Sequence, residues 1–276
     1  MKGRGRDRPR QLPGRSAAPW KSALAGGLAG LILTLILQFP AAWLASALQQ
    51  LTEGRVLLSQ ASGTIWSGSA RLVLSGGTDS QSISALPGRL DWRARPQWDG
   101  LTVQLLAECC TTAPLSLAIR PRWGGVRLDV QPQSPAPTPP IQLPADLLTG
   151  LGAPWNTLEV EGQLRLTFQG LSVEWTQGRM SIAGRAELIA SGMSSRLSTL
   201  KPMGSYRITI TGGNTTRLEL ATLDGSLQLS GTGQWVGSRL RFTGEASAAP
   251  DREAALSNLL NIIGRRNGPR SIISVG

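Results

Sequence analysis

Histidine is absent from the 276 residues of this chain, and the only cysteines are Cys109 and Cys110. Without histidine, Ser-His-Asp and Cys-His catalytic sites and every histidine-ligated metal site are excluded. Two adjacent cysteines also cannot supply the paired C-x-x-C spacing of a structural zinc site. We therefore expect no metal, no cofactor and no enzymatic activity.

The cysteine pair has two interpretations. Adjacent Cα atoms lie about 3.8 Å apart, below the ~4.4–6.8 Å that is usual for a disulfide, so a bond between Cys109 and Cys110 would be strained. The pair is therefore either two small buried side chains or a vicinal disulfide formed outside the reducing cytoplasm.

Lysine is scarce as well, and Lys201 is the only lysine beyond residue 21. It completes an S-x-x-K pattern with Ser198, which is the arrangement of some serine acyl-enzymes. Pro202 disfavours the helical turn that would bring these two side chains together, and no K-T-G or S-D-N element follows. We therefore predict no catalytic residue here.

The net charge of +11 is unevenly distributed along the chain. Residues 1–21 carry +6 of it, whereas residues 22–52 contain no charged residue. An apolar run of about 20 residues can cross a bilayer, and flanking arginines keep their side in the cytoplasm. We predict a cytoplasmic tail over 1–21 and a transmembrane anchor over 22–43, with Trp20 and Trp43 at the interfaces, rather than nucleic-acid binding.

Ala45-Ser46-Ala47 offers an alternative, because an A-x-A pattern after an apolar run is typical of a signal peptide cleaved after Ala47. The apolar run is longer than the roughly 7–15 residues of a signal h-region. Pro40 and Trp43 also precede any cleavage site. We therefore prefer an uncleaved anchor, with the rest of the chain outside the cytoplasm.

Beyond the anchor, apolar and polar residues alternate, as in VRLDV (126–130), YRITITG (206–212) and RLRFTG (239–244). This period of two is typical of antiparallel strands with one buried face. Glycines before several of these segments suit tight hairpin turns. The sequence predicts a mainly β protein with an antiparallel sheet of repeated hairpins.

Two further features divide this sheet region. Prolines concentrate in residues 131–144, which predicts a linker between a first half (54–130) and a second half (145–276). Near the end of the chain, Asp251 is expected to cap a short helix over 251–263, with Gly264 as its stop.

Most of the nine tryptophans lie in or at the ends of predicted strands. Packing in the core or across strands is the commonest use of such residues, and we expect it here. A patch that binds a partner is the next interpretation.

Several motifs, in this order behind one anchor, resemble the type II secretion system protein N (general secretion pathway protein N) family. They are FPAAW at the end of the anchor, then SGTIWSG, GRLDWRARP, LQLSGTGQWVGSRLRFTG and the terminal LSNLLNIIGRRNG. The residues that carry the resemblance are Gly63, Thr64, Ile65, Trp66, Gly68, Leu90, Trp92, Pro96, Gly231, Gly233, Gly244 and Gly264.

The resemblance implies a non-catalytic, single-pass inner-membrane component of the machine that exports folded periplasmic proteins across the outer membrane. Its expected partners are subunits of the inner-membrane platform or the outer-membrane channel, and membrane lipid around the N-terminal helix. Nucleic acid and small-molecule substrates are not expected.

The chain is also similar to AsmA-like proteins, whose curved sheets form an apolar trough associated with lipid or outer-membrane biogenesis. This similarity implies that the antiparallel sheet is extended and curved, as a trough or an open roll. A trough that is open and apolar along its length would favour this alternative. A face closed by its own side chains or by the helix over 251–263 would favour a scaffold.

Overall fold

The computed structural model describes residues 20–77, 80–131, 141–237 and 239–276. The chain divides into two compact units, with the boundary between Phe39 and Pro40. The predicted basic tail lies outside the described residues up to residue 19, as does most of the predicted linker (132–140).

The first unit contains helix α1 (Trp20–Leu37), whose leucine and isoleucine side chains are exposed along its length. Within the described residues, no helix combines the length and the apolar character needed to cross a membrane. The predicted segment 22–43 is not one helix, because a second helix begins after Pro40 in the other unit. Proline lacks a backbone N–H and disfavours helical geometry in the preceding residue, so α1 ends before it.

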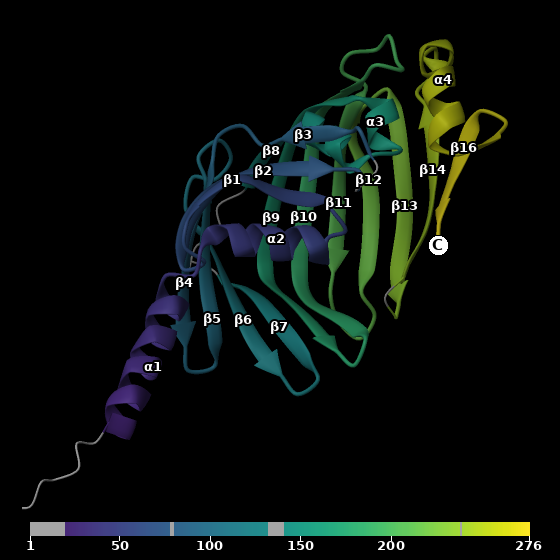
Figure 1. Ribbon diagram of the computed structural model, residues 1–276. Coiled ribbons are helices and arrows are strands. Elements are labelled where there is room, and N and C mark those ends of the chain that lie inside the picture. Colours follow the sequence, from purple (N-terminus) through teal and green to yellow (C-terminus); the bar gives the residue numbers. More distant parts are fainter. Residues whose placement is uncertain (1–19, 78–79, 132–140, 238) are drawn as a thin grey trace, which may run out of the picture. The chain divides into compact units, whose positions relative to one another are not determined.

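The second unit is built on one open antiparallel sheet, which has sixteen strands in the described part of the chain (Figure 1). This confirms the prediction of a mainly β, antiparallel protein. Along the sheet, the main path runs through β1 (Val56–Gly63), β2 (Ser67–Ser75), β4 (Leu90–Gln97), β5 (Gly100–Ala107), β6 (Leu115–Arg122), β7 (Gly125–Gln131), β9 (Val160–Thr176), β10 (Arg179–Ser195), β11 (Gly204–Thr211), β12 (Arg217–Gly225), β13 (Leu227–Val236), β14 (Arg239–Ala248), β16 (Arg270–Val275) and β15 (Arg265–Asn267).

The sheet continues across the predicted linker. Strand β7 pairs directly with β9, with Leu128 opposite Val173, so the two predicted halves belong to one sheet. The last four residues of the predicted linker form strand β8 (Ile141–Pro144), which pairs with the first part of β9. Pro144 is the last residue of this short strand, where a missing N–H is tolerated.

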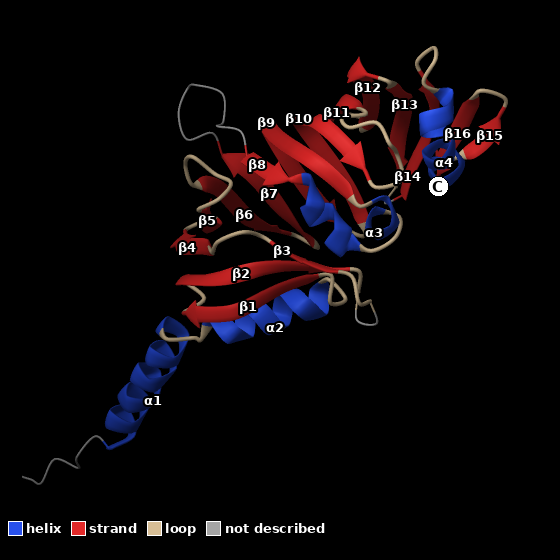
Figure 2. Ribbon diagram, turned by 90° about the horizontal axis from the view of Figure 1, so that it is seen from above, coloured by secondary structure: helices blue, strands red, loops and turns tan. Residues whose placement is uncertain are grey.

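Short helical segments hold the sheet in a roll, which Figure 2 shows from above. Helix η1 (Ala145–Leu151) and helix α3 (Trp155–Leu158) lie between β9 and the short strand β3 (Ile83–Ala85). Asn156 Nδ2 donates to Ser82 Oγ at 3.0 Å, and Ser84 Oγ donates to the Asp146 carbonyl at 3.5 Å. These contacts join the beginning of the sheet to its middle.

Helix α2 (Ala41–Leu51) packs at the start of the sheet, where Ala41 is 1% exposed and clusters with Ala70 and Trp92. The A-x-A pattern at Ala45–Ala47 lies inside this helix. Cleavage after Ala47 would therefore remove Ala41 from the cluster that it helps to form.

Helix α4 (Glu253–Ile263) lies near the other end of the sheet, against β14, β15 and β16. The prediction of this helix over 251–263 was correct at its end, because the helix ends at Ile263 with Gly264 as the C-cap, but wrong at its start. Asp251 has a φ of 63° and does not cap the helix, because Arg252 holds the N-cap position without a side-chain hydrogen bond. Gly264 is extended, not left-handed, and its small size allows close approach to the Ile272 carbonyl.

Neither edge of the sheet offers a long, regular strand for pairing. The edge strand β15 has three residues, all exposed, of which Arg265 and Arg266 are charged. At the opposite edge, β1 carries a register shift between Ser59 and Ser62, with Gln60 at a φ of 53°. Short, charged or bulged edges are the usual ways to discourage pairing with a further strand.

Candidate functional site

One face of the sheet is apolar over much of β9–β16, and its rows of side chains follow from the strand register. Each strand sends alternate residues to this face, so residues opposite each other form a row across the sheet. One such row, which we call the open row, is made of Phe168, Ala186, Ile210, Leu218, Gly233, Phe242 and Val275. It crosses seven strands without a charged residue.

Nearer the helices, the same face is covered. Leu256 and Leu260 of α4 are 0% exposed and pack with Leu158 of α3 and Leu164 of β9 in one core cluster. Tyr206 is also in this cluster, and its hydroxyl donates to the Leu227 carbonyl at 3.2 Å. Burial raises the pKa of Tyr206 well above its usual value. No residue of the open row belongs to this cluster.

A cavity of about 250 Å³ lies between α4, α3 and the sheet. Its wall is apolar and includes Leu188, Ile208, Leu220, Leu259 and Ile273. The side chains of Leu188, Ile208, Leu220 and Ile273 lie in the row next to the open row. The apolar face is therefore closed by helices at one end and hollow in the middle. Along the open row it is not covered by a helix, and only Ala186 of that row is buried.

The glycines of the family motif LQLSGTGQWVGSRLRFTG (227–244) lie under an aromatic ring on this face. Gly231 and Gly244 are opposite each other in β13 and β14, and Gly233 is opposite Phe242. A Cβ at Gly231 would overlap the Phe242 ring, and Cβ atoms at Gly233 and Gly244 would lie 3.1 and 3.0 Å from it. Phe242 therefore supplies apolar surface for three residues that have no side chain.

The structure brings the family motifs SGTIWSG (62–68) and GRLDWRARP (88–96) together at the start of the sheet. Gly68 lies opposite Trp92, and a Cβ at Gly68 would come within 2.5 Å of the indole ring. Trp92 is 4% exposed, and its Nε1 donates to the Thr64 carbonyl at 3.2 Å. Gly63 has a φ of 89°, which suits glycine at the β1–β2 turn. The two motifs thus form a packed contact between β2 and β4, made of Gly63, Thr64, Gly68 and Trp92, which we call the joint.

The remaining motif residues surround this joint. Ile65 and Trp66 lie in the β1–β2 turn, where the Trp66 carbonyl accepts a hydrogen bond from the Ala94 N–H at 2.6 Å. Leu90 is opposite Ala107 and Pro96 is opposite Leu101. None of these contacts brings together groups that could perform acid, base or nucleophilic chemistry.

Sequence reasoning did not single out Arg89 as a site residue, although it fixes the joint from the other face. Its guanidinium donates to Ser69 Oγ at 2.8 Å, to Ser62 Oγ at 3.1 Å and to the Gln60 carbonyl at 3.2 Å. Arg89 thereby holds the bulged part of β1 against β2. The only sequence feature that could have pointed to this role of Arg89 is its position directly after Gly88 in the GRLDW motif.

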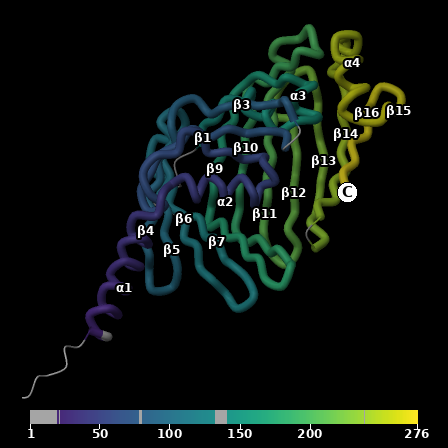
Figure 3. The backbone as a smooth tube through the Cα atoms, in the orientation of Figure 1, coloured from purple at the N-terminus to yellow at the C-terminus, as the bar shows by residue number. Residues whose placement is uncertain are grey.

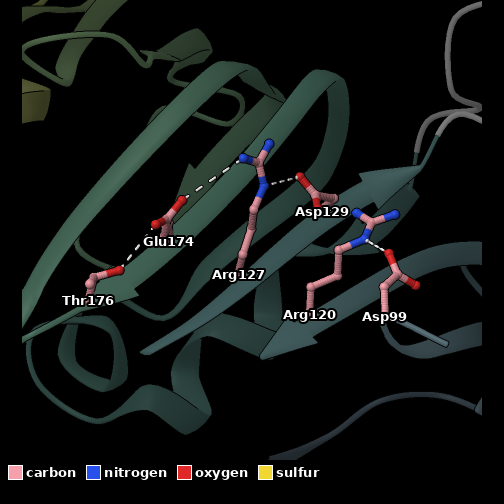
Figure 4. A network of polar contacts seen from close by, with 6 residues as sticks. All are labelled: Asp99, Arg120, Arg127, Asp129, Glu174 and Thr176. Carbon is pink, nitrogen blue, oxygen red and sulfur yellow. Dashed lines mark hydrogen bonds and ion pairs between the residues drawn. The ribbon is translucent and has the colours of Figure 1, made fainter. Parts of the chain in front are cut away.

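The polar face of the sheet carries a network of charges (Figure 4). Arg120 pairs with Asp99 at 2.5 Å and with Asp129 at 2.6 Å, and Arg127 pairs with Asp129 at 2.9 Å and with Glu174 at 3.9 Å. The hydrogen bond from Arg120 holds the pKa of Asp99 below its usual value. Each acid here has a basic partner, so the network cross-links strands.

The other candidates from sequence have structural partners. Ser198 Oγ donates to the Ala255 carbonyl at 3.4 Å, while Lys201 pairs with Glu161 at 3.6 Å, so the S-x-x-K residues are engaged separately. A disulfide joins Cys109 to Cys110, whose Cα atoms are 3.7 Å apart. Among the described residues, no cluster of acidic, cysteine or histidine side chains could hold a metal ion.

The tryptophans differ most from expectation. Trp92 packs as predicted, but Trp98 and Trp123 are 107% and 100% exposed. Both lie in the turns of hairpins and not within strands, so no neighbouring strand can cover them. The prediction of core or cross-strand packing was wrong for these two residues.

Comparison with known proteins gives one match. The model of the family described as type II secretion system (T2SS), protein N matches residues 54–273. No curated protein and no solved structure matches the chain. The match includes every strand from β1 to β15 and reaches into β16.

Proposed function

This chain belongs to the type II secretion system protein N family, and we propose that it serves protein secretion as a non-catalytic scaffold that offers the open row to another secretion subunit. Membership of the family makes it a component of the secretion machinery. The choice of the apolar face as the contact surface is our own inference.

The open row is the observation that carries this proposal. Phe168, Ile210 and Leu218 are half-buried and Val275 is 52% exposed. Apolar surface that is continuous over several strands marks an interaction site more often than scattered exposed residues do. The interrupted edges at β1 and β15 favour a contact through the face over addition of a strand.

We further propose that α1 places the second unit in the periplasm and holds it at the inner membrane. The helix has 18 residues, which corresponds to about 27 Å at a rise of 1.5 Å per residue. Its exposed leucines and isoleucines would be stabilised by lipid. The arginine-rich sequence before it supports a cytoplasmic N-terminus. A periplasmic reporter fused after Gly276 should be active, and an inactive reporter would refute this orientation.

Site-specific photo-crosslinking tests the contact surface. A benzophenone amino acid in place of Leu218 should crosslink to a platform or channel subunit in solubilised envelopes. Thr232 is the matched control, because it is exposed on the polar face of the adjacent strand. Equal crosslinking from both positions, or crosslinking only to lipid-export components, would contradict the proposal.

Placing a charged residue in the open row tests whether secretion requires this surface. Leu218→Asp should reduce secretion of exported proteins while the amount of the folded chain stays near normal, because Leu218 lies outside the core cluster. Thr232→Asp should leave secretion unchanged. Normal secretion with Leu218→Asp would show that the open row is not a required contact.

The cavity between α4 and the sheet favours a second candidate function, lipid binding in the manner of AsmA-like proteins. Its wall is apolar, and its volume of about 250 Å³ would accept part of an acyl chain. Stoichiometric phospholipid in the purified full-length chain, lost on Ala190→Phe or Ile208→Trp, would support this function. Lipid that stays bound to these variants would belong to α1 and not to the cavity.

A further inference from the structure

Four hairpins turn at the same end of the sheet, and each carries a tryptophan. These are the hairpins β4–β5, β6–β7, β9–β10 and β13–β14, whose turns are spread along one end of the sheet in Figures 1 and 3. The register agrees, since β7 begins opposite the last residue of β9 and β6 ends where β7 begins. We call these four residues the tryptophan rim: Trp98, Trp123, Trp175 and Trp235.

The rim exposes far more aromatic surface than a soluble protein requires. Trp98 and Trp123 are fully exposed at the turns, and Trp175 is 46% exposed. Tryptophan is highly buried on average, because its indole is large and mostly apolar. Two fully exposed indoles on neighbouring hairpins therefore mark a surface that is covered in use.

Arginines accompany the indoles at the same turns. Arg95, Arg122, Arg179 and Arg239 are exposed and form no ion pair within the described part of the chain. The acids at or beside these turns, Asp99 and Glu174, are paired with Arg120 and Arg127. The rim is therefore both aromatic and positively charged.

We propose that the tryptophan rim docks on the surface of a phospholipid bilayer that contains anionic lipids. Indole rings favour the headgroup region, where the apolar ring is buried and the N–H stays hydrated. Each arginine near an anionic surface strengthens binding. The indoles stand on separate hairpins and do not converge on one pocket, which suits a broad lipid surface better than a single peptide.

This inference does not rest on the proposed secretion contact, which uses the open row, or on the insertion of α1. Docking of the rim would fix how the sheet stands on the membrane. A single flexible tether could not do so.

Quenching of tryptophan fluorescence by brominated lipid tests the proposal with the full-length chain. The chain is reconstituted in vesicles of phosphatidylcholine and phosphatidylglycerol with and without brominated acyl chains. The double variant Trp98→Ser/Trp123→Ser should lose a large part of the lipid-quenched emission. Trp155→Phe is the comparison variant, because Trp155 precedes β9 at the opposite end of the sheet and lines the apolar cavity, so its emission reports lipid in the cavity and not docking of the rim.

The charge dependence is tested in the same vesicles. Arg122→Gln should weaken docking of the rim by about fivefold, the loss expected for one arginine at an anionic surface, and pure phosphatidylcholine should weaken it further. Any quenching of Trp20 by insertion of α1 is common to all variants and cancels in the comparison. Equal lipid quenching in the unmodified chain and the double variant would overturn the proposal, as would quenching that is independent of anionic lipid.

Discussion

The covered and uncovered parts of the apolar face have similar sequences but different environments. Leu227 and Leu229 begin β13 beneath α4 and join the core, whereas Gly231 and Gly233 continue the same alternation without covering helices. On β12, Leu220 lines the cavity while Leu218, two residues away, belongs to the open row. The alternating pattern thus determines which face a residue occupies, while distant helices determine whether that face is buried.

The largest expected effect tests the covered part. Leu260→Ala should lower the free energy of unfolding by about 2–5 kcal/mol, because Leu260 is 0% exposed and its truncation leaves a cavity in the core. Leu218→Ala should cost about 1 kcal/mol or less, because the side chain is already partly hydrated. Denaturant unfolding of both variants of the full-length chain measures the difference. Equal losses would show that the open row is as well packed as the core.

Adding a methyl group beneath Phe242 should have an intermediate effect. Gly231→Ala would force its new Cβ against the ring and should destabilise the protein by about 1–3 kcal/mol. Truncating the ring removes this overlap, so Gly231→Ala should cost much less in a Phe242→Ala background. A double-mutant cycle from unfolding curves gives the coupling energy. A coupling near zero would mean that the ring does not lie over Gly231.

Trp92→Phe should have a smaller effect, and it extends the comparison to the start of the sheet. The phenylalanine ring still covers Gly68 but cannot donate to the Thr64 carbonyl, so we expect a loss of about 1 kcal/mol. Trp92→Ala, which also removes the ring, should cost at least twice as much. If Trp92→Phe and Trp92→Ala are equally destabilising, then ring packing does not stabilise this joint.

The smallest expected effect concerns the polar face. The hydrogen bond from Arg120 holds the pKa of Asp99 below its usual 3.8 in the folded chain. This pair therefore contributes stability above pH 3.8 that is lost as the pH falls through the lowered pKa of the folded state. Asp99→Asn should slightly reduce stability at pH 7 and flatten the acid limb of the stability profile. An unchanged acid limb would show that solvent screens the pair completely.

Sequence reasoning predicted the strands well, because alternation between apolar and polar residues is a local property. It placed YRITITG and RLRFTG on antiparallel strands, and the structure confirms this. The single buried face was predicted less well, because Ile210 and Phe242 are only half-buried. The N-terminal cap of the C-terminal helix was not predicted, since Asp251 adopts a positive φ of 63° and Arg252 holds the N-cap position.

The arrangement of the apolar face could be predicted less well. The open row depends on register, which places Leu218 opposite Gly233 across two strands. The proline-rich segment suggested a break because prolines exclude central strands, but β7 and β9 pair on either side of it. The exposure of Trp98 and Trp123 also depends on the position of hairpin turns in three dimensions. A pattern of apolar residues does not contain that information.

The blunt edges of the sheet have a consequence for how copies of the chain behave at high local concentration. A broad sheet could template its own growth into fibres if a neighbouring chain could align along it. At one edge, β15 has only three residues and two of them are charged. At the other edge, the register shift in β1 interrupts the regular spacing of its backbone N–H and C=O groups. An incoming strand therefore cannot form a long, regular series of backbone hydrogen bonds at either edge. Crowded copies should therefore remain dispersed, and overproduction should not seed amyloid-like aggregates.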